Sequence, residues 1–309
     1  MIMVNPAAFA SNVIDIHGEL GRAWLQQLPE IIVTYAQRWS LKVLPPFKQL
    51  SYHYVAPAIQ ADGSPAVLKA GVPHLELSRE IEALREFDGN GLARLLQADP
   101  QAGIFLEERL LPGTPLAGLL AGQEGDEQIV RIATQVMQRL WKPAPNGRRF
   151  ATLEEWASDL NSLHTAFGGA YGPFPVELVE QAHHRFAELI IPTAQSWLIH
   201  GDLHMENILK SDRDVWLAID PKGVVGAREW DITTLLCDMP EGMCDRDLKN
   251  RLERRSALLA ELLGFERQHI LAWSLAQMVL RGWWSYEDHG GGWQAAFHIA
   301  DLTNSLLNP

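Results

Sequence analysis

The chain has 309 residues, of which 47% are hydrophobic and 21% charged, a composition that predicts a folded protein with one large or two ordinary cores. Its formal net charge of -12 argues against nucleic acid as a partner, because phosphate binding needs a basic surface, and favours a cationic small molecule. No apolar run approaches the roughly 18 residues that span a bilayer, and the N-terminal sequence MIMVNPAAFASNVID lacks the basic start and apolar core of an export signal. We therefore expect a cytoplasmic protein with no membrane partner.

Residues 18–44 place leucine, isoleucine and aromatic side chains at helical spacing, and Pro29 interrupts the pattern, so two short helices are predicted. The sequence then changes to β-branched and aromatic stretches on either side of QADGS, in which Asp62 and Gly63 form a strong turn signal. The pattern predicts a β-hairpin that ends at Lys69.

The stretch HLELSREIEALREFDGNG has apolar residues in helical register and stops at two glycines, so a helix should follow the hairpin directly. Residues 104–106 then predict an apolar strand. Further helices are predicted at 126–141, 152–166, 176–190, 231–236, 246–263, 267–285 and 293–307. We expect a boundary near residue 110, with a small β-rich lobe over 1–109 and a larger helical lobe over 110–309.

The stretch WLIHGDLHMENIL, residues 197–209, contains polar side chains that suit either a metal site or a catalytic loop. His200, Asp202 and His204 alternate, so on a strand all three would point to one face, and imidazole with carboxylate is ordinary zinc or iron ligation. A metal-dependent hydrolase is therefore one hypothesis, although it leaves the nearby Asn207 without a role. The only cysteines, Cys237 and Cys244, are too few for the four-ligand set of a structural zinc site.

As a catalytic loop, the same stretch provides residues that ATP chemistry needs. Asp202 and Asn207 stand five residues apart, as do the aspartate and asparagine of the H-R-D-x-x-x-x-N loop of protein kinases. Asp220 lies thirteen residues after Asn207, just past the apolar stretch VWLAI. Lys69, in AVLK, matches the strand lysine of the V-A-I-K motif, and the following helix offers Glu80 to hold it.

HGDLHMEN, IDPKG and REWDITTLL occur in this order and together resemble the aminoglycoside phosphotransferase superfamily, whose loop reads H-G-D-x-x-x-x-N. LSYHYVAPA, VLKAG, LEERLLPGTPL and IDPKGVVG resemble more closely its streptomycin 6-phosphotransferase and hydroxyurea-resistance kinase branch. The resemblance implies an α+β, protein-kinase-like fold of two lobes, with ATP and Mg²⁺ as cofactors. Residues 1–109 would form the nucleotide-binding lobe, and 110–309 would carry the catalytic loop and the acceptor site.

Carried over by position, the resemblance makes Asp202 the catalytic base that orients the acceptor hydroxyl. Asn207 and Asp220 would be the Mg²⁺ ligands. His200 and Asp231 would brace the catalytic loop without touching the substrate.

In the N-terminal lobe, the resemblance implies that Lys69 contacts the ATP phosphates and that Glu80 positions it. Glu76, one helical turn earlier on the same side, is a rival for that role. The turn expected over the phosphates, SYHYVAP, has no glycine, and it carries His53 where we expect an asparagine in this branch. The hinge that reads the adenine edge would be Glu107, Glu108, Arg109 and Leu110.

A cationic or polyhydroxylated acceptor should meet carboxylates, because charge-assisted hydrogen bonds are the strong ones. Residues 110–309 carry 17 basic against 26 acidic residues, so most of the net negative charge lies there. The candidates are Glu154, Glu155, Asp159, Asp238, Glu241, Glu287 and Asp288. Glu287 and Asp288 are favoured, because SYEDHGGGW is predicted to form a loop between two helices and loops often carry specificity.

These observations predict an ATP-dependent O-phosphotransferase that acts on an aminoglycoside of the streptomycin type or a related small polar compound. A protein kinase is disfavoured, because the chain after Asp220 has no A-P-E segment and runs through VVGAREWD into a helix. A non-catalytic pseudokinase and the metal-dependent hydrolase are the alternatives.

Overall fold

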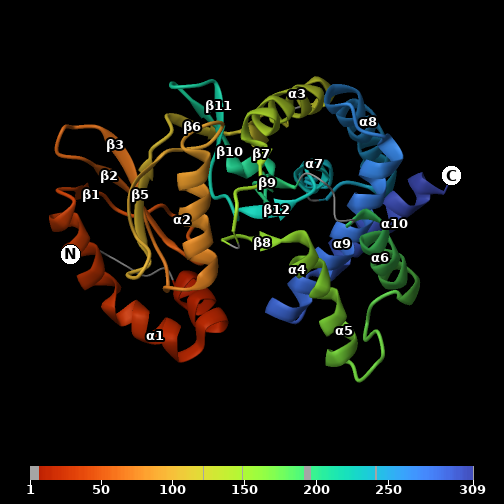
Figure 1. The fold of residues 1–309 in the computed structure, drawn as a ribbon, viewed down its shortest axis with the longest axis horizontal. Coiled ribbons are helices and arrows are strands. Elements are labelled where there is room, and N and C mark those ends of the chain that lie inside the picture. Colours follow the sequence, from red (N-terminus) through yellow and green to blue (C-terminus); the bar gives the residue numbers. More distant parts are fainter. Residues whose placement is uncertain (1–6, 121, 148, 191–195, 241, 309) are drawn as a thin grey trace. The chain divides into compact units, whose positions relative to one another are not determined.

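The computed structural model describes residues 7–120, 122–147, 149–190, 196–240 and 242–308. It divides the chain into two compact units, coloured along the sequence in Figure 1. Unit 1 comprises Met1–Gly113 and Lys210–Leu217, and unit 2 comprises Thr114–Leu209 and Ala218–Pro309. No helix in the described part of the chain is long and apolar enough to cross a membrane.

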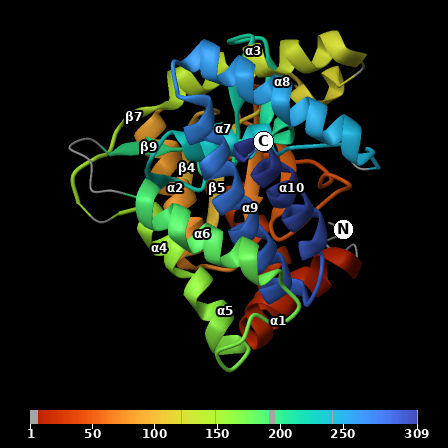
Figure 2. The same cartoon turned by 90° about the vertical axis from the view of Figure 1, so that its right-hand side faces the viewer.

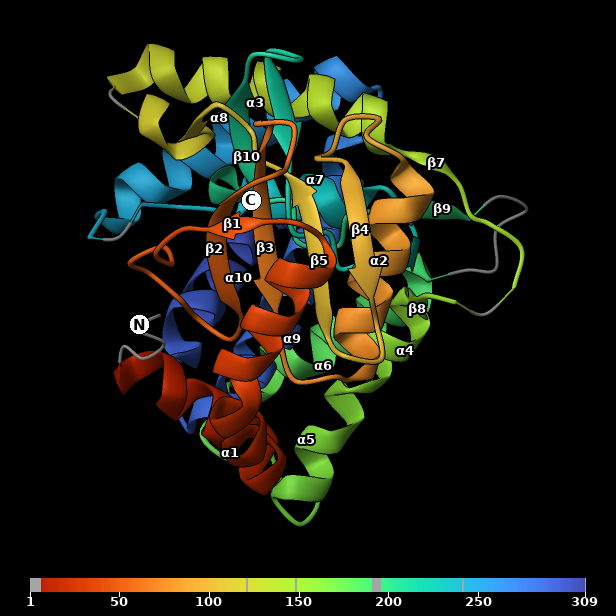
Figure 3. The same cartoon turned by 90° about the vertical axis from the view of Figure 1, so that its left-hand side faces the viewer.

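Unit 1 is built on a five-stranded sheet of order β1-β2-β3-β5-β4, in which all neighbours are antiparallel (Figure 3). Its strands are β1 (Lys42–Val43), β2 (Tyr54–Ile59), β3 (Pro65–Ala70), β4 (Leu95–Asp99) and β5 (Ile104–Glu108). The hairpin predicted from the sequence is confirmed as β2 and β3, and the Asp62 carboxylate stabilises its turn by accepting the N–H of Ser64 at 2.9 Å.

The two faces of this sheet are covered by different helices (Figures 1 and 3). Helix α1 (Ala7–Arg38) buries Phe9, Leu28 and Ile32 in one cluster with Leu68 and Leu106 of the sheet. Side chains alternate along a strand, so Lys69 and Phe105 point to the opposite face. Helix α2 (Leu75–Phe87) contributes its buried side chains there. The face away from α1 therefore presents the strand lysine to α2.

The predicted division of the N-terminal helix at Pro29 is wrong. Helix α1 continues through Pro29, and the residue with non-helical dihedrals inside it is Gly18, with φ 56° and ψ -131°. Glycine adopts a positive φ without a Cβ clash, whereas the proline lies between Leu28 and Ile32, whose burial stabilises the helix on either side.

The segment Lys210–Leu217 belongs to unit 1, where Arg213 holds it by hydrogen bonds. Its Nε donates to Glu108 Oε1 at 2.8 Å, and its Nη1 and Nη2 donate to the carbonyls of Gly89 and Leu92 at 3.1 and 2.8 Å. Three strands, β6 (Pro112–Pro115), β10 (Ile208–Ser211) and β11 (Trp216–Ala218), form a small sheet of order β11-β10-β6 where the chain passes from one unit to the other.

Unit 2 is mainly helical, as predicted, so the α+β fold class is confirmed. Its helices are η1 (Leu116–Leu119), α3 (Gly122–Leu140), α4 (Leu153–Ser158), α5 (Leu160–Ala166), α6 (Val176–Leu189), η2 (Met205–Asn207), α7 (Glu229–Leu236), α8 (Asp245–Leu263), α9 (Arg267–His289) and α10 (Trp293–Leu307). Helix α9 packs against α6, α7, α8 and α10, and Figure 2 shows it flanked by α6 and α10. Its buried Trp273 and Trp283 help to form the core.

A four-stranded sheet of order β7-β9-β12-β8 accompanies these helices. Its strands are β7 (Lys142–Pro143), β8 (Ala151–Thr152), β9 (Trp197–Ile199) and β12 (Val224–Gly226). Strand β9 ends one residue before His200, so the candidate catalytic loop starts from this sheet.

Three predicted helices in unit 2 have other bounds in the structure. Helix α3 begins at Gly122, four residues before the predicted start at 126. The helix expected over 152–166 is divided at Asp159 into α4 and α5, and a capping box at Thr152 and Glu155 begins the first of them. Helix α9 runs to His289, four residues beyond the predicted end, and stops at Gly290 with φ 67°. Gly290, with the left-handed conformation that favours glycine, is the physical end of this helix.

Candidate active site

The strand lysine of unit 1 forms a buried ion pair. Lys69 Nζ donates to Glu80 Oε1 at 2.7 Å, and the two side chains are only 4% and 8% exposed. The Lys69 ammonium also lies 5.8 Å from the centre of the Phe105 ring. Glu76, the rival partner, is 55% exposed in its side chain and lies 3.7 Å from the His74 ring. The structure thus pairs Lys69 with Glu80.

The predicted hinge residues lie at the end of β5 and just beyond it. Glu107 and Leu110 are buried, while Arg109 is half-buried. The Glu108 carboxylate is engaged with Arg213 and accepts the backbone N–H of Arg94 at 3.2 Å. The Glu108 N–H donates to the Arg94 carbonyl at 2.8 Å. Glu108 therefore stabilises unit 1.

His53, in the turn before β2, packs directly against the end of β3. A Cβ added to Gly71 would lie 2.4 Å from His53 Cδ2, so any larger residue at position 71 would have to displace this imidazole. The His53 ring also stacks with His74, with 6.5 Å between ring centres. An imidazole thus lies where the resemblance leads us to expect an asparagine side chain.

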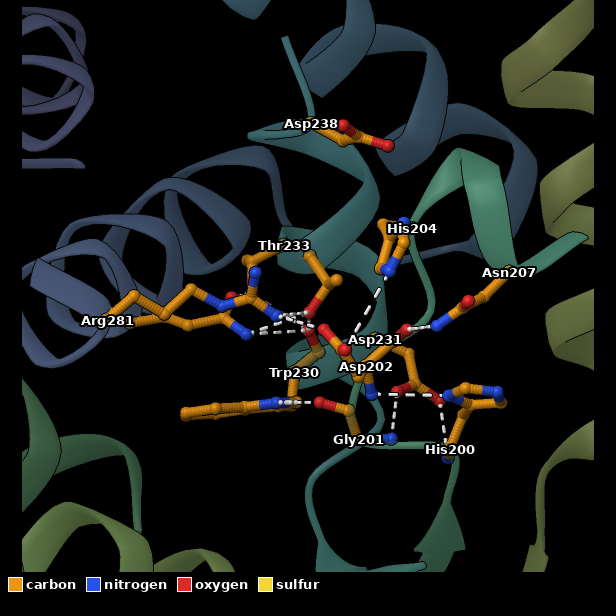
Figure 4. A network of polar contacts seen from close by, with 12 residues as sticks. His200, Gly201, Asp202, His204, Asn207, Trp230, Asp231, Thr233, Asp238 and Arg281 are labelled. Atoms are coloured by element: carbon orange, nitrogen blue, oxygen red, sulfur yellow. Dashed lines mark hydrogen bonds and ion pairs between the residues drawn. The ribbon is translucent and has the colours of Figure 1, made fainter. Parts of the chain in front are cut away.

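In unit 2, the loop after β9 is held by the buried carboxylate of Asp231 (Figure 4). Its Oδ2 accepts the N–H of His200 at 3.0 Å, and its Oδ1 accepts the N–H of Gly201 at 2.9 Å. The indole of Trp141 donates to Oδ2 at 3.1 Å. Burial raises the pKa of Asp231, and the three N–H donors oppose that shift. This carboxylate lies behind the loop backbone and braces it.

Both ring nitrogens of His200 are engaged inside the protein. Its Nδ1 accepts the N–H of Asp202 at 3.2 Å, which leaves the proton on Nε2 to donate to the Ile219 carbonyl at 2.8 Å. The side chain is fully buried, and burial lowers its pKa, which keeps the ring neutral.

The metal-hydrolase hypothesis for His200, Asp202 and His204 is wrong. Strand β9 ends at Ile199, so the three residues lie in a loop and do not share a strand face. Neither nitrogen of His200 is available to a metal. Within the described ranges, no group of three His, Cys, Asp or Glu side chains is arranged to hold a metal ion.

Asp202 follows Gly201 at the turn of the loop, and its side chain is 30% exposed. Arg281 Nη2 donates to its Oδ1 at 2.9 Å, and His204 Nε2 lies 3.8 Å from its Oδ2 (Figure 4). Burial alone would raise the pKa of Asp202, but the charges of Arg281, His204 and Lys222 outweigh it and hold this pKa below its usual value. Asp202 is therefore an ionised, accessible carboxylate.

Asn207 ends this loop and Asp220 follows β11, and the two lie on neighbouring stretches of chain, because the Ile219 N–H donates to the Asn207 carbonyl at 3.0 Å. The amide nitrogen of Asn207 donates to the Asp202 carbonyl at 3.0 Å, which leaves the amide oxygen for another partner. Asp220 has a φ of 57°, a left-handed conformation that aspartate tolerates better than most residues. One amide oxygen and one carboxylate are the hard donors that Mg²⁺ prefers, so the pair fits that ion.

Asp238, one of the predicted acceptor residues, is bonded to the loop itself. Its Oδ2 accepts the N–H of Met205 at 2.6 Å at the start of η2. The buried Arg255 donates from Nη1 to the Asp238 carbonyl at 2.7 Å and from Nε to Asp126 Oδ1 at 2.8 Å. Asp238 thus supports the catalytic loop.

The other acceptor candidates are spread over α4 and α9, and Glu241 lies outside the described residues. Glu287 and Asp288, predicted in a loop, lie in the last turn of α9 because the helix extends to Gly290. The pKa of Glu287 is raised by burial and by the charges of Asp159 and Asp288. Trp284, also on α9, donates its indole N–H to Asp159 Oδ2 at 3.2 Å. Three carboxylates therefore gather near the end of α9.

Two supporting residues escaped the sequence analysis. Arg281 is separated from Asp202 by 79 positions, and no local pattern connects them. Gly201 has a φ of 88°, and a Cβ there would lie 2.8 Å from Val224 Cγ2 and 3.1 Å from Trp156. The glycine in the H-G-D motif was a visible signal for such a crowded turn.

A family described as aminoglycoside/hydroxyurea antibiotic resistance kinase matches residues 41–290 of the chain. The chain belongs to this family. It is therefore a kinase, and membership of the aminoglycoside/hydroxyurea resistance kinase family implies ATP as the phosphoryl donor. The family match begins just after α1 and ends with α9, so it contains the candidate site residues described above but neither α1 nor α10.

Named proteins align over most of the chain. It is 30% identical to streptomycin 6-kinase of Streptomyces glaucescens over 285 residues, 92% of this chain and 91% of that protein. It is 31% identical to hydroxyurea phosphotransferase of Kitasatospora aureofaciens over 284 residues, 92% of this chain and 80% of that protein.

Solved structures are similar in fold at lower identity. Choline kinase LicA of Streptococcus pneumoniae has a TM-score of 0.60 at 15% identity, covering 90% of this chain and 99% of that one. Macrolide 2'-phosphotransferase MphH of Brachybacterium faecium has a TM-score of 0.54 at 16% identity, covering 91% and 98%. At these identities the likeness shows the fold alone.

Proposed function

We propose that this kinase transfers the γ-phosphoryl group of Mg²⁺-ATP to a hydroxyl of a small polar molecule, an aminoglycoside of the streptomycin type or a related compound. The observation that carries the proposal is the state of Asp202: an ionised carboxylate, 30% exposed, on a loop whose backbone is held by buried Asp231. Such a carboxylate can accept a hydrogen bond from an acceptor hydroxyl and align it for attack.

In the proposed reaction, the acceptor oxygen attacks the γ-phosphorus, and a new P–O bond forms as the bond to the β,γ-bridging oxygen breaks. ADP leaves with that oxygen, and Asp202 receives the hydroxyl proton before releasing it to solvent. The Lys69 ammonium would contact the ATP phosphates, held in place by Glu80 at 2.7 Å. When bound, Mg²⁺ would neutralise phosphate charge, with Asn207 and Asp220 as its protein ligands.

We further propose that cationic groups of the acceptor bind near the end of α9. Support comes from the surroundings of Glu287, whose pKa is raised by burial and by the nearby charges of Asp159 and Asp288. A bound guanidinium or ammonium would relieve this repulsion by charge-assisted hydrogen bonds. Asp238 is assigned to loop support instead, because its carboxylate is bonded to Met205.

The test is ADP release from Mg²⁺-ATP by wild type and Asp202→Asn, measured with streptomycin, other aminoglycosides, hydroxyurea, amino sugars and simple polyols. Asn keeps the shape of Asp202 and removes its charge. The proposal expects at least one of these compounds to stimulate ADP release by wild type and none to stimulate the variant. Nucleotide binding is measured on the same samples, and binding of Mg²⁺-ATP without stimulated turnover would point to an acceptor outside this panel or to a pseudokinase.

A further inference from the structure

Arg281 reaches from α9 onto one oxygen of the Asp202 carboxylate. Its Nη2 lies 2.9 Å from Asp202 Oδ1 (Figure 4). The same nitrogen lies 3.3 Å from Thr234 Oγ1. Both members of the ion pair are 30% exposed in their side chains, so water screens the pair only partly. Because Arg281 contacts only Oδ1 in this way, Oδ2 remains on the side of His204, 3.8 Å away.

The Arg281 guanidinium contacts a buried hydrogen-bond network. Gln277, one helical turn before Arg281, donates from Nε2 to Thr234 Oγ1 at 2.8 Å. The Thr234 hydroxyl donates to the Trp230 carbonyl at 3.0 Å, and the Trp230 indole donates to the Gly201 carbonyl at 2.9 Å. These contacts run from α9 through α7 to the residue before Asp202. The arginine and the carboxylate are therefore held by one connected set of side chains.

We propose that Arg281 is a positioning residue for phosphoryl transfer: it holds Asp202 by Oδ1 so that Oδ2 faces the acceptor hydroxyl. An unrestrained carboxylate rotates about its terminal bond and presents either oxygen in many directions. A charge-assisted hydrogen bond to one oxygen removes most of that freedom before the acceptor binds. The inference rests on the proposed function, because it assigns Asp202 the role of orienting the acceptor.

The test compares Arg281→Gln and Arg281→Lys with a matched control, Arg267→Gln. Arg267 is at the start of the same helix, where its Nε donates to Ser256 Oγ at 3.0 Å, so the control removes an α9 guanidinium that does not touch Asp202. The kcat and both KM values are measured by ADP release, with the acceptor from the panel above that wild type phosphorylates fastest.

We expect Arg281→Gln to lower kcat by about 10- to 100-fold, the effect of losing one well-placed charge-assisted hydrogen bond, with the KM for ATP unchanged. Lysine should restore most of kcat, because an ammonium can replace a guanidinium that contacts one oxygen through one nitrogen. The control should keep the wild-type kcat.

A wild-type kcat in Arg281→Gln, or a loss that lysine does not restore, would overturn the inference. A rise in the KM for ATP without a fall in kcat would also overturn it, since the arginine would then act on nucleotide binding. A wild type that phosphorylates no acceptor would overturn the proposed function and this inference together. An active wild type with an unimpaired Arg281→Gln would overturn this inference alone.

Discussion

The buried pair of Lys69 and Glu80 gives a quantitative prediction about stability. The two side chains are 4% and 8% exposed and 2.7 Å apart, so each charge depends on the other in place of water. Lys69→Met removes the ammonium and leaves the Glu80 carboxylate buried, and Glu80→Leu leaves the ammonium buried. Each single change should lower the free energy of unfolding by about 3–5 kcal/mol.

The double variant, Lys69→Met with Glu80→Leu, replaces both charges by apolar groups of similar size. It should be more stable than either single variant, because no uncompensated charge remains buried. Its affinity for ATP should nevertheless stay as low as that of Lys69→Met, since the proposed phosphate contact is absent from both. Urea denaturation followed by tryptophan fluorescence measures the stability, and titration with Mg²⁺-ATP measures the affinity.

Arg131 and Glu127 on α3 form a control pair at the same distance. Their side chains are 49% and 58% exposed and 2.7 Å apart, so Arg131→Met should cost no more than about 1 kcal/mol. The reasoning is refuted if the losses of the two buried single variants add in the double variant, or if the exposed pair proves as costly to break as the buried one.

Three further predictions concern Gly201, Asp231 and the pair of His269 and Glu229. Gly201→Ala should lower the free energy of unfolding by about 2–4 kcal/mol, because the new Cβ would contact Val224. The control Gly290→Ala, also at a positive φ but with no atom within 4 Å, should lower it by about 1–2 kcal/mol. Urea denaturation measures both, and equal losses would contradict the contact argument. Asp231→Asn should cost about 2–4 kcal/mol and remove turnover, because an amide nitrogen cannot accept the N–H bonds of the loop, and a stable, active variant would disprove the bracing role. The hydrogen bond to Glu229 raises the pKa of His269 above 6.5. The stabilising effect of this contact is therefore fully present below pH 6.5 and is lost as the pH rises through the pKa of His269 in the folded state. The melting temperatures of wild type and Glu229→Gln should converge at alkaline pH, and a difference between them that does not depend on pH would count against this pairing.

Local patterns in the sequence were sufficient to predict the parts of the fold that depend on neighbouring residues. The hairpin of β2 and β3 follows from alternation around an Asp-Gly turn, and α2 follows from its apolar spacing and terminal glycines. The pairing of Lys69 with Glu80 was also predictable, because they lie eleven positions apart on a strand and the helix that follows it. Choosing Glu80 over Glu76 required the geometry of the helix face.

Contacts between distant residues could not be predicted in the same way. Arg281 meets Asp202 across 79 positions, and Trp141 meets Asp231 across 90. Nothing in the neighbourhood of any one of these residues specifies its partner, because tertiary packing of α9 and α7 brings them together. The end of α9 differs from the prediction for a related reason: the polar residues after position 285 are typical of a loop, whereas the helix continues to His289 and ends at Gly290.

The most direct test of the proposed chemistry is transfer of labelled phosphate. Purified wild type and Asp202→Asn are incubated with Mg²⁺ and ATP labelled in the γ-phosphate, together with streptomycin or the panel compound that best stimulates ADP release, and the product is isolated and analysed by mass spectrometry. The proposal predicts that wild type places the label on a hydroxyl oxygen of the acceptor and that Asp202→Asn, although it binds Mg²⁺-ATP, transfers none. Transfer by Asp202→Asn at the wild-type rate, or label released by wild type only as inorganic phosphate, would contradict it.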